Sequence, residues 1–326
     1  MKLWIEKIHL DLKVNWKLSR NQTTFKENFI VHLETGDGHF TSEIAPNIRY
    51  GETINNISKE FEDYVGSIDL KKIDSIISLS DSLVAIKLHA LRFGLESVFL
   101  SYLAKKEGKN LSSYLNLPAP KSVATSFSMP IIPVNEIEVY LKPLGRFSSL
   151  KIKVNAETGL DMLQEIRRYT DAKLRVDANE GWSHFEEYLK FEKSLDGMNI
   201  ELIEQPFPSS MHEEYKELKK FTPYKLLADE SIEDVGDFSE LSKQFHAMNI
   251  KLMKTGSLLK ARDLLMEAKK FGLESMMGCM IETTIGISYG MLFSGMVEYV
   301  DLDGFLLVKN EPFHLVSEAE GQLTLS

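Results

Sequence analysis

The sequence has little that could build a disulfide, a thiolate metal cluster or a membrane span. Cys279 is the only cysteine among 326 residues, which excludes an intrachain disulfide and a set of cysteine ligands. The net charge of -10 argues against a nucleic-acid partner, because phosphate binding requires clustered lysine and arginine. The most apolar helix-like stretch, 82–104, carries Lys87, Arg92 and Glu96, so we expect a core helix and no membrane partner.

Common catalytic and targeting signatures are also absent. The sequence contains no G-x-G-x-x-G, no Walker-type loop, no H-E-x-x-H and no G-x-S-x-G, so nucleotide-binding, zinc-protease and serine-hydrolase motifs are excluded. Glu6, Lys7 and Asp11 interrupt the apolar N-terminal run, and we therefore expect no secretory signal. A reducing, cytoplasmic location is the expectation.

The chain changes character near Pro118 and Pro120, the best candidate for a domain boundary. Before it, the first ~50 residues have strand-like alternation around a Thr35-Gly36-Asp37-Gly38 turn, and residues 52–117 follow a helical period. This pattern predicts an α+β domain over 1–117. The tail, 307–326, is β-like, and we expect it to pair with that N-terminal domain.

Strands and helices alternate from residue 118 to 306. The predicted strands are 122–131, 151–154, 174–176, 201–203, 225–227, 248–251, 274–277 and 298–301. Alternation of this kind favours a parallel sheet, and eight strands favour a closed α/β barrel over an open sheet. In such a barrel the carboxyl ends of all strands lie on one face, where active sites are built.

Three consecutive predicted strands end in carboxylates. Asp177, Glu204 and Asp229 are separated by 27 and 25 residues, so their side chains can converge on one cation. Oxygen ligands alone suit Mg²⁺, or Mn²⁺, and not zinc. Asn179 and Glu230 are expected to support these ligands. The alternative is that acids end strands simply because they are exposed there.

Lysines flank the carboxylates. Lys151 and Lys153 share one strand face, and facing inward each would lower the pKa of the other, which makes a usable base. Lys251 ends the sixth strand, opposite the second strand that ends at Lys153. One base on each side of a carbon is what a 1,1-proton transfer requires. Lys251 could instead form a Schiff base or be a surface charge, and Lys254 is an alternative position.

Further acids follow the last two strands. Asp301 and Asp303 point the same way and could clamp a cationic group, or they could be exposed loop acids. Glu282 is either a site residue or the first acid of a helix. We expect His246 to be structural and Cys279 to be a small buried hydrophobe.

Several segments together resemble one family. In chain order they are LKIKV, RVDANEGW, ELIEQP, ADES, NIKLMKTG, MMGCMIET and DLDG, between about residues 150 and 307. This series resembles the enolase superfamily, in its muconate-lactonizing subgroup, and the dipeptide epimerases of the Ala-Glu type in particular. The resemblance implies a (β/α)7β TIM-like barrel over 118–306, with the N-terminal α+β domain as a cap.

The resemblance also implies roles for the candidate residues. Mg²⁺ would be held by Asp177, Glu204 and Asp229, while Lys153 and Lys251 would exchange a proton at Cα of the C-terminal residue of a dipeptide. Lys151 would tune Lys153, and the pair Asp301 and Asp303 would bind the N-terminal ammonium. In this family a loop near the N-terminus, here 15–25, contributes to specificity, and its Arg20 could pair with an acidic side chain.

The expected function is therefore a Mg²⁺-dependent isomerase that epimerises a dipeptide such as L-Ala-D/L-Glu from cell-wall peptide turnover. The alternative in the same superfamily is o-succinylbenzoate synthase or N-acylamino-acid racemase, whose substrates have no free ammonium for Asp301 and Asp303. A sugar-acid dehydratase would usually have a histidine–aspartate pair where Lys251 stands. A Schiff-base aldolase and a non-catalytic binding barrel are the remaining alternatives. The oligomeric state is open, a homo-oligomer included.

Overall fold

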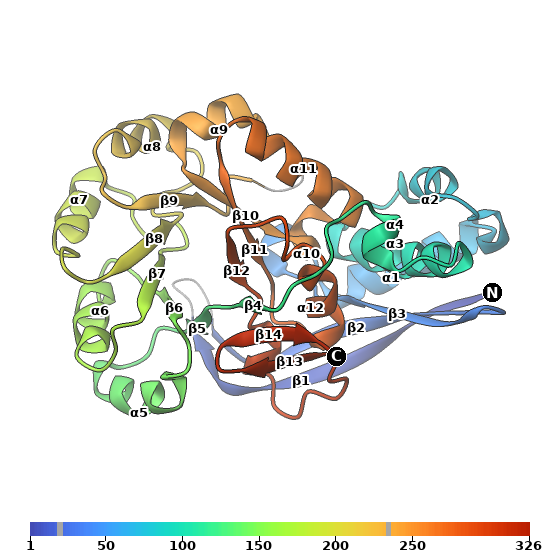
Figure 1. Cartoon of the computed structure of the whole chain (residues 1–326), viewed down its shortest axis with the longest axis horizontal. Helices are drawn as coiled ribbons and strands as arrows, with labels where there is room; N and C mark the ends of the chain where they lie inside the picture. The colour runs from blue at the N-terminus through green and yellow to red at the C-terminus, as the bar shows by residue number, and fades with distance from the viewer. Residues whose placement is uncertain (18–21, 233–235) are drawn as a thin grey trace.

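The computed structural model describes residues 1–17, 22–232 and 236–326. An antiparallel N-terminal sheet, with helices packed on it, lies beside an eight-stranded parallel sheet (Figure 1). A second set of helices surrounds the parallel sheet. Within the described residues, every helix is too short or too polar to cross a bilayer.

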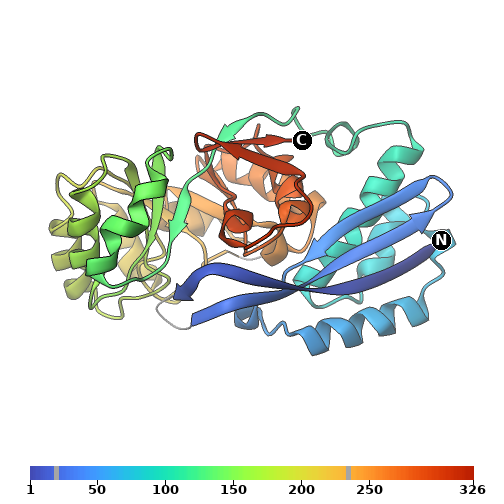
Figure 2. The ribbon, with the colours of Figure 1, turned by 90° about the horizontal axis from the view of Figure 1, so that it is seen from below.

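The N-terminal sheet is a three-stranded meander of β1 (Lys2–Lys17), β2 (Gln22–Thr35) and β3 (Gly38–Ile44). Thr35 pairs with Gly38 across the tight turn, as the sequence predicts. The first two strands are long and reach away from the N-terminus toward the barrel (Figure 2). There the amide of Ile131 donates to the carbonyl of Lys17 at 3.0 Å, so the sheet and the barrel are in direct contact.

Four helices follow the meander: α1 (Ile54–Ser67), α2 (Ile76–Leu83), α3 (His89–Lys106) and α4 (Leu111–Tyr114). Thr53 and Asn56 cap α1 reciprocally. The predicted core helix is confirmed as α3, although it begins at His89. It packs closely on the sheet because Gly94 has no side chain: a Cβ there would lie 2.5 Å from Ile44 Cγ1.

Eight strands form the parallel sheet, each paired in parallel with the next. They are β5 (Phe127–Met129), β6 (Ser149–Lys153), β7 (Lys173–Asp177), β8 (Ile200–Glu204), β9 (Lys225–Ala228), β10 (Ala247–Lys251), β11 (Glu274–Gly278) and β12 (Tyr299–Asp301). The first and last strands meet where the Ser126 amide donates to the Val300 carbonyl at 3.2 Å. The predicted barrel is confirmed.

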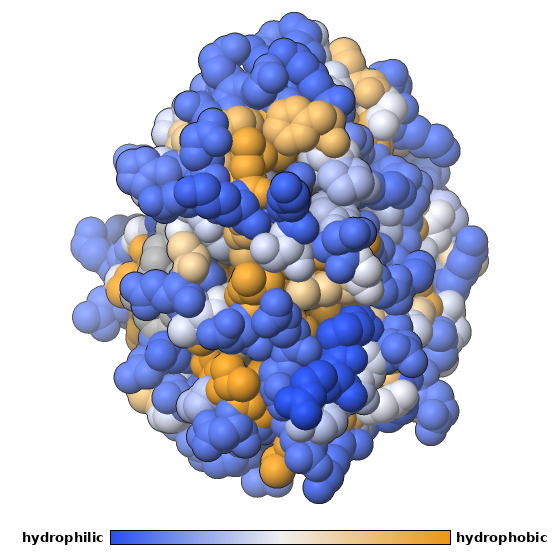
Figure 3. Space-filling view, turned by 90° about the vertical axis from the view of Figure 1, so that its left-hand side faces the viewer, coloured by the Kyte–Doolittle hydropathy of each residue, from blue (hydrophilic) through white to orange (hydrophobic). Residues whose placement is uncertain are grey.

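Helices cover the outside of this barrel. They are α5 (Ile137–Leu141), α6 (Gly159–Arg167), α7 (Phe185–Lys193), α8 (His212–Lys219), α9 (Phe238–Gln244), α11 (Leu258–Lys270) and α12 (Thr284–Met291), with one short turn, α10 (Leu252–Thr255), directly after β10. On the side of α6, α7 and α8 the surface is mainly hydrophilic (Figure 3). These helices bury residues such as Tyr188 and Tyr215, so their polar faces point outward.

Two predictions about strands are corrected. The predicted strand 122–131 is split, because β4 (Val123–Ala124) leaves the barrel and only β5 joins it. The tail forms a hairpin of β13 (Val316–Ala319) and β14 (Gln322–Leu325) that pairs with β4, whereas we expected pairing with the N-terminal domain. β4 offers a free edge, and pairing there buries Val316 and Leu323. The tail segment does touch β1 through the Leu12–Val308 bridge.

Candidate active site

The carboxyl ends of the strands bring the predicted site residues together. Five of them are the last residues of their strands: Lys153, Asp177, Glu204, Lys251 and Asp301. The third predicted metal ligand, Asp229, directly follows β9. A cavity of about 510 Å³ lies between these strand ends and the N-terminal domain. Its walls include Trp16, Lys26, Asn47, Arg49 and Tyr50 from that domain, and Ser128, Lys151, Lys153, Asn179, Asp229, Glu230, Lys251, Cys279, Met280, Ile281, Asp301 and Asp303 from the barrel.

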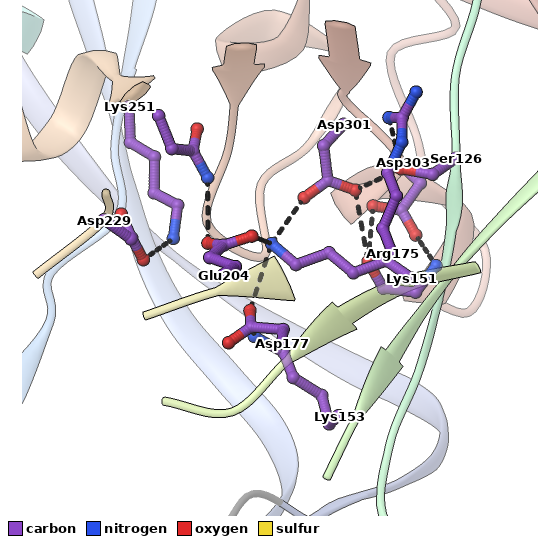
Figure 4. Close-up of polar contacts among 12 residues, drawn as sticks. Ser126, Lys151, Lys153, Arg175, Asp177, Glu204, Asp229, Lys251, Asp301 and Asp303 are labelled. Atoms are coloured by element: carbon purple, nitrogen blue, oxygen red, sulfur yellow. Dashed lines mark hydrogen bonds and ion pairs between the residues drawn. The ribbon is translucent and has the colours of Figure 1, made fainter. Parts of the chain in front are cut away.

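Lys151 lies at the centre of the charged groups (Figure 4). Its Nζ is 2.9 Å from both Asp301 Oδ2 and Glu204 Oε2, and 3.1 Å from Asp177 Oδ2. Burial alone would lower the pKa of Lys151, but the surrounding carboxylates raise it well above its ordinary value. The net pKa of Lys151 is therefore not lowered as predicted, because the surrounding carboxylates dominate.

Lys153 and Lys251 approach the carboxylates from opposite sides of the barrel. Lys153 Nζ is 2.5 Å from Asp177 Oδ2, and Lys251 Nζ is 2.6 Å from Asp229 Oδ2. Their strands, β6 and β10, are separated by three strands on either side. Burial lowers and Asp229 raises the pKa of Lys251, and the net result is a pKa above its ordinary value. Both ammonium groups line the cavity.

Lys254 is on α10 and is not among the described residues that line the cavity. Its Nζ donates to Asp229 Oδ1 and to the Asp229 carbonyl, both at 2.7 Å, and to the Asn249 carbonyl at 3.2 Å. The two oxygens of the Asp229 carboxylate are thus shared between Lys254 and Lys251. This geometry favours Lys251 over Lys254 as the lysine that faces a ligand.

Polar neighbours contact two of the three carboxylates, Asp177 and Glu204. The amide of Asn179 donates to Asp177 Oδ1 at 3.1 Å, and its side chain donates to Glu230 Oε1 at 3.4 Å, so the two predicted supporting residues do lie beside the carboxylates. Sequence reasoning missed Asn249, whose Nδ2 donates to Glu204 Oε1 at 3.1 Å. Its position two residues before Lys251, on the same strand face, was an available signal.

Asp301 and Asp303 are buried, which excludes the alternative of exposed loop acids. Ser126 Oγ donates to Asp301 Oδ1 at 2.7 Å, and the Ser128 amide donates to Asp303 Oδ2 at 2.5 Å. Burial raises the pKa of Asp301, but Lys151 brings it down to about 2. Burial and the charge of Asp301 raise the pKa of Asp303 to about 7. The two serines were not identified from the sequence, because they precede the site by some 175 residues.

Of the remaining candidates, Glu282 is not brought into the cavity and Arg20 lies outside the described residues. Glu282 is buried behind the wall, where its Oε1 accepts from the Met280 amide at 2.8 Å, and it is not among the described residues that line the cavity. Its placement therefore does not support the predicted contact with substrate. His246 Nδ1 accepts from the Leu226 amide at 3.0 Å, a structural role as predicted.

The oxygen-rich set beneath the cavity has the chemistry of a divalent-cation site. Asp177, Glu204 and Asp229 are all buried, and Glu204 Oε2 accepts no hydrogen bond although Lys151 Nζ is 2.9 Å away. As the side chains of the described residues stand, no three acidic, histidine or cysteine groups form a ligand shell, because lysine ammonium groups separate them. The donors fit a hard cation such as Mg²⁺.

Comparison with known proteins agrees with this geometry. Residues 136–314 match the family described as "Enolase C-terminal domain-like". The chain is 30% identical to the L-Ala-D/L-amino acid epimerase of Flavobacterium johnsoniae, over 100% of this chain and 97% of that protein. It is also 30% identical to the L-Ala-D/L-Glu epimerase of Bacteroides thetaiotaomicron, over 91% of this chain and 77% of that protein.

A solved structure of a dipeptide epimerase has the same fold as this chain. The dipeptide epimerase of Enterococcus faecalis, solved with Mg and the dipeptide L-Leu-L-Tyr, superposes with a TM-score of 0.88 at 26% identity, over 99% of this chain and 96% of that one. The strand-end carboxylates, the opposed lysines and these matches lead to one conclusion. The chain belongs to the enolase superfamily, in its dipeptide epimerase family.

Proposed function

We propose that this protein is a Mg²⁺-dependent dipeptide epimerase. The observation that carries the proposal is the pair of lysines, Lys153 and Lys251, on opposite strands of the barrel with buried carboxylates between them. With one proton-transfer group on each side of the reacting carbon, one can remove the proton and the other can return a proton to the opposite face, which inverts the configuration.

The three carboxylates Asp177, Glu204 and Asp229 would hold the metal ion. Bound there, Mg²⁺ would supply positive charge that offsets the negative charge developing on the substrate as Cα loses its proton. Asn179 would orient Asp177, Asn249 would orient Glu204, and Glu230 would support the ligands through its bond with Asn179.

Lys153 and Lys251 would move the proton. One of them, as the neutral amine, takes the Cα proton of the C-terminal residue, and the other, as the ammonium, returns a proton to the opposite face. The net charge of the pair is unchanged, and the configuration is inverted. Lys151 is held by three carboxylates, so it would act as a fixed positive charge that tunes Lys153.

Asp301 and Asp303 would bind the N-terminal ammonium of the dipeptide. Both line the cavity and are held in place by serines, and two buried carboxylates side by side favour a cationic partner. N-acylated and succinylated substrates carry no such cation. This contrast favours a dipeptide over the substrates of an N-acylamino-acid racemase.

The proposed substrates are small dipeptides such as L-Ala-D/L-Glu, released from cell-wall peptides in the cytoplasm. The single cysteine suits a reducing compartment. Residues 1–117 would form the cap and 118–306 the catalytic barrel. The protein could also assemble into a homo-oligomer, with each subunit divided in this way.

The test is incubation with a dipeptide library in D₂O and Mg²⁺, read by mass spectrometry. Deuterium is expected at Cα of the second residue, and Lys153→Ala and Lys251→Ala should each lower epimerisation by about 10² to 10⁴, with exchange of one stereoisomer retained. Lys190→Ala, at an exposed position on α7, is the matched control. Exchange of N-acylated amino acids but no dipeptide would contradict the proposal.

A further inference from the structure

A buried carboxylate from the N-terminal domain reaches one wall of the cavity. Glu43, near the end of β3, is fully buried. Both of its oxygens lie 3.0 Å from the Thr283 amide, and its Oε2 also accepts from Thr283 Oγ1 at 2.7 Å and from the Gly286 amide at 3.0 Å. The side chain thus caps the first turn of α12, which is 240 residues away in the chain.

A second buried polar residue completes the attachment. Asn28 on β2 donates through Nδ2 to Glu43 Oε1 at 2.8 Å and to the Ile281 carbonyl at 3.1 Å. A buried carboxylate is costly unless hydrogen bonds compensate it, and the amides at a helix start provide them. The N-terminal sheet therefore holds the segment 281–286 of the barrel at two points.

This segment continues into the cavity wall beside the two aspartates. Cys279, Met280 and Ile281 line the cavity together with Asp301 and Asp303. Gly304 packs directly on the wall, since a Cβ at that position would overlap the Met280 carbonyl and lie 3.1 Å from Cys279 Sγ. A displacement of residues 279–283 would therefore change the shape of the cavity next to Asp303.

We infer that Glu43 is a positioning residue for substrate selection: it fixes the wall 279–283 and thereby determines which N-terminal residue of a dipeptide fits beside Asp301 and Asp303. The inference rests on the proposed function, because it places the substrate ammonium at these aspartates. Glu43 lies behind the wall and touches no reacting atom, so its effect belongs in selectivity and not in proton transfer.

The experiment compares Gly-Glu, Ala-Glu and Leu-Glu as substrates of the wild type and of Glu43→Gln. Glutamine keeps the size of the side chain, but its amide group must face the donors of Thr283 and Gly286 or of Asn28. The ratio of kcat/KM between Ala-Glu and Gly-Glu is expected to change roughly tenfold, the range in which a pocket discriminates single carbon groups. The kcat for the best substrate should stay within about threefold.

Glu192→Gln is the matched control, because Glu192 is a buried carboxylate on α7 bonded to Tyr188 and Thr222, away from the cavity. It should leave the ratio unchanged. If Glu43→Gln does not fold, Thr283→Val removes the 2.7 Å hydroxyl bond to Glu43, together with the 3.2 Å bond that Thr283 Oγ1 accepts from the Ile285 amide. It leaves the backbone bonds of Glu43 in place and should change the ratio in the same direction by less.

The outcomes separate the two proposals. An equal loss of kcat/KM for all three dipeptides, or no change, in the folded variant would overturn the role of Glu43 while leaving the enzyme a dipeptide epimerase. Failure of the wild type to epimerise any dipeptide would instead reject the proposed function itself.

Discussion

Four lysines and five carboxylates are buried at one end of the barrel. They are Lys151, Lys153, Lys251, Lys254, Asp177, Glu204, Asp229, Asp301 and Asp303. Charges so far from water are tolerated only when they are paired and hydrogen-bonded, and each lysine contacts at least one of the acids. Removal of one member weakens the charge compensation of its buried partners, so substitutions that preserve size and hydrogen bonding are the informative ones.

Glu282 gives a pH-dependent contribution to stability. Burial, and then the charge of Glu43, raise its pKa from 4.5 to about 8. The folded protein thus holds the Glu282 proton more tightly than the unfolded chain, so this contribution is complete below about pH 4.5 and is lost as the pH rises through 8. Glu282→Gln should remove it.

The measurement is the free energy of unfolding in urea between pH 5 and 9. The wild type should lose about 1.4 kcal/mol more per pH unit than Glu282→Gln over the range from 5 to 8. Parallel curves for the two proteins would show that Glu282 ionises normally in the folded state.

At the scale of single residues, the sequence predicted which side chains lie together at the strand ends but not which lysine pairs with which carboxylate. Strand period and spacing were enough to bring Lys153, Asp177 and Glu204 together. The rise in the pKa of Lys151 depends on Asp301, a neighbour 150 residues away, and no local pattern contains that contact. Glu43 was missed for the same reason, since its role appears only when the N-terminal sheet meets α12.

At the scale of helices and strands, one helix determines how closely the N-terminal sheet and its helical layer approach. Helix α3 lies against β2 and β3 with Gly94 at the contact, where Ile44 and Val31 leave no room for a side chain. The same helix also binds the segment that follows Lys251 and α10. Arg92 donates to the Gly256 carbonyl at 3.1 Å, and Glu96 accepts from the Leu258 amide at 2.5 Å.

Two helical glycines of the N-terminal domain should respond to alanine with opposite sign. Gly94→Ala should destabilise the protein by roughly 1–3 kcal/mol, because its Cβ would meet Ile44 Cγ1 at 2.5 Å. Gly66→Ala in α1, with nothing within 4 Å, should stabilise by about 0.5–1 kcal/mol through helix propensity. Urea denaturation measures both, and equal effects would argue against close packing at Gly94.

The two corrected predictions about strands have a common origin: the strand 122–131 is divided, and the tail pairs mainly with β4 and with β1 only through the Leu12–Val308 bridge. The run 122–131 alternates like a single strand, and the tail is β-like, so local pattern could not say which edge each would join. Pairing of β4 with β14 depends on where the chain returns after the last barrel strand. The choice between Lys251 and Lys254 also needed the structure, because α10 begins immediately at Leu252 and directs Lys254 to the carbonyl and carboxylate of Asp229.

At the scale of the whole molecule, the N-terminal domain and the barrel together form the walls of the cavity. Asn47, Arg49 and Tyr50 from the N-terminal domain face Lys153 and Lys251 from the barrel. Arg49 Nη2 also donates to Glu180 Oε2, in the loop after β7, at 2.9 Å. A ligand bound between the strand ends and this domain would therefore stabilise both parts at once.

Mg²⁺ should raise the midpoint of thermal unfolding. At a hundredfold excess over its Kd, a ligand of the folded state contributes about 2.7 kcal/mol, which corresponds to a shift on the order of 5 °C for a chain of this size. Differential scanning fluorimetry with Mg²⁺, and with Na⁺ at equal ionic strength, measures the effect. Glu204→Gln should abolish the shift, and an equal shift in that variant would place the ion elsewhere.

The junction of β5 with β12 both closes the barrel and holds the two aspartates proposed to bind the substrate ammonium. The ring of strands closes through the Ser126–Val300 bond, and beside it the Leu302 amide donates to Thr125 Oγ1 at 3.0 Å. Ser126 and Ser128, on one side of this seam, also hold Asp301 and Asp303 on the other. Exchanging those aspartates to admit a different molecule would thus loosen the ring itself, so new specificities at this position should evolve together with compensating changes in the two serines.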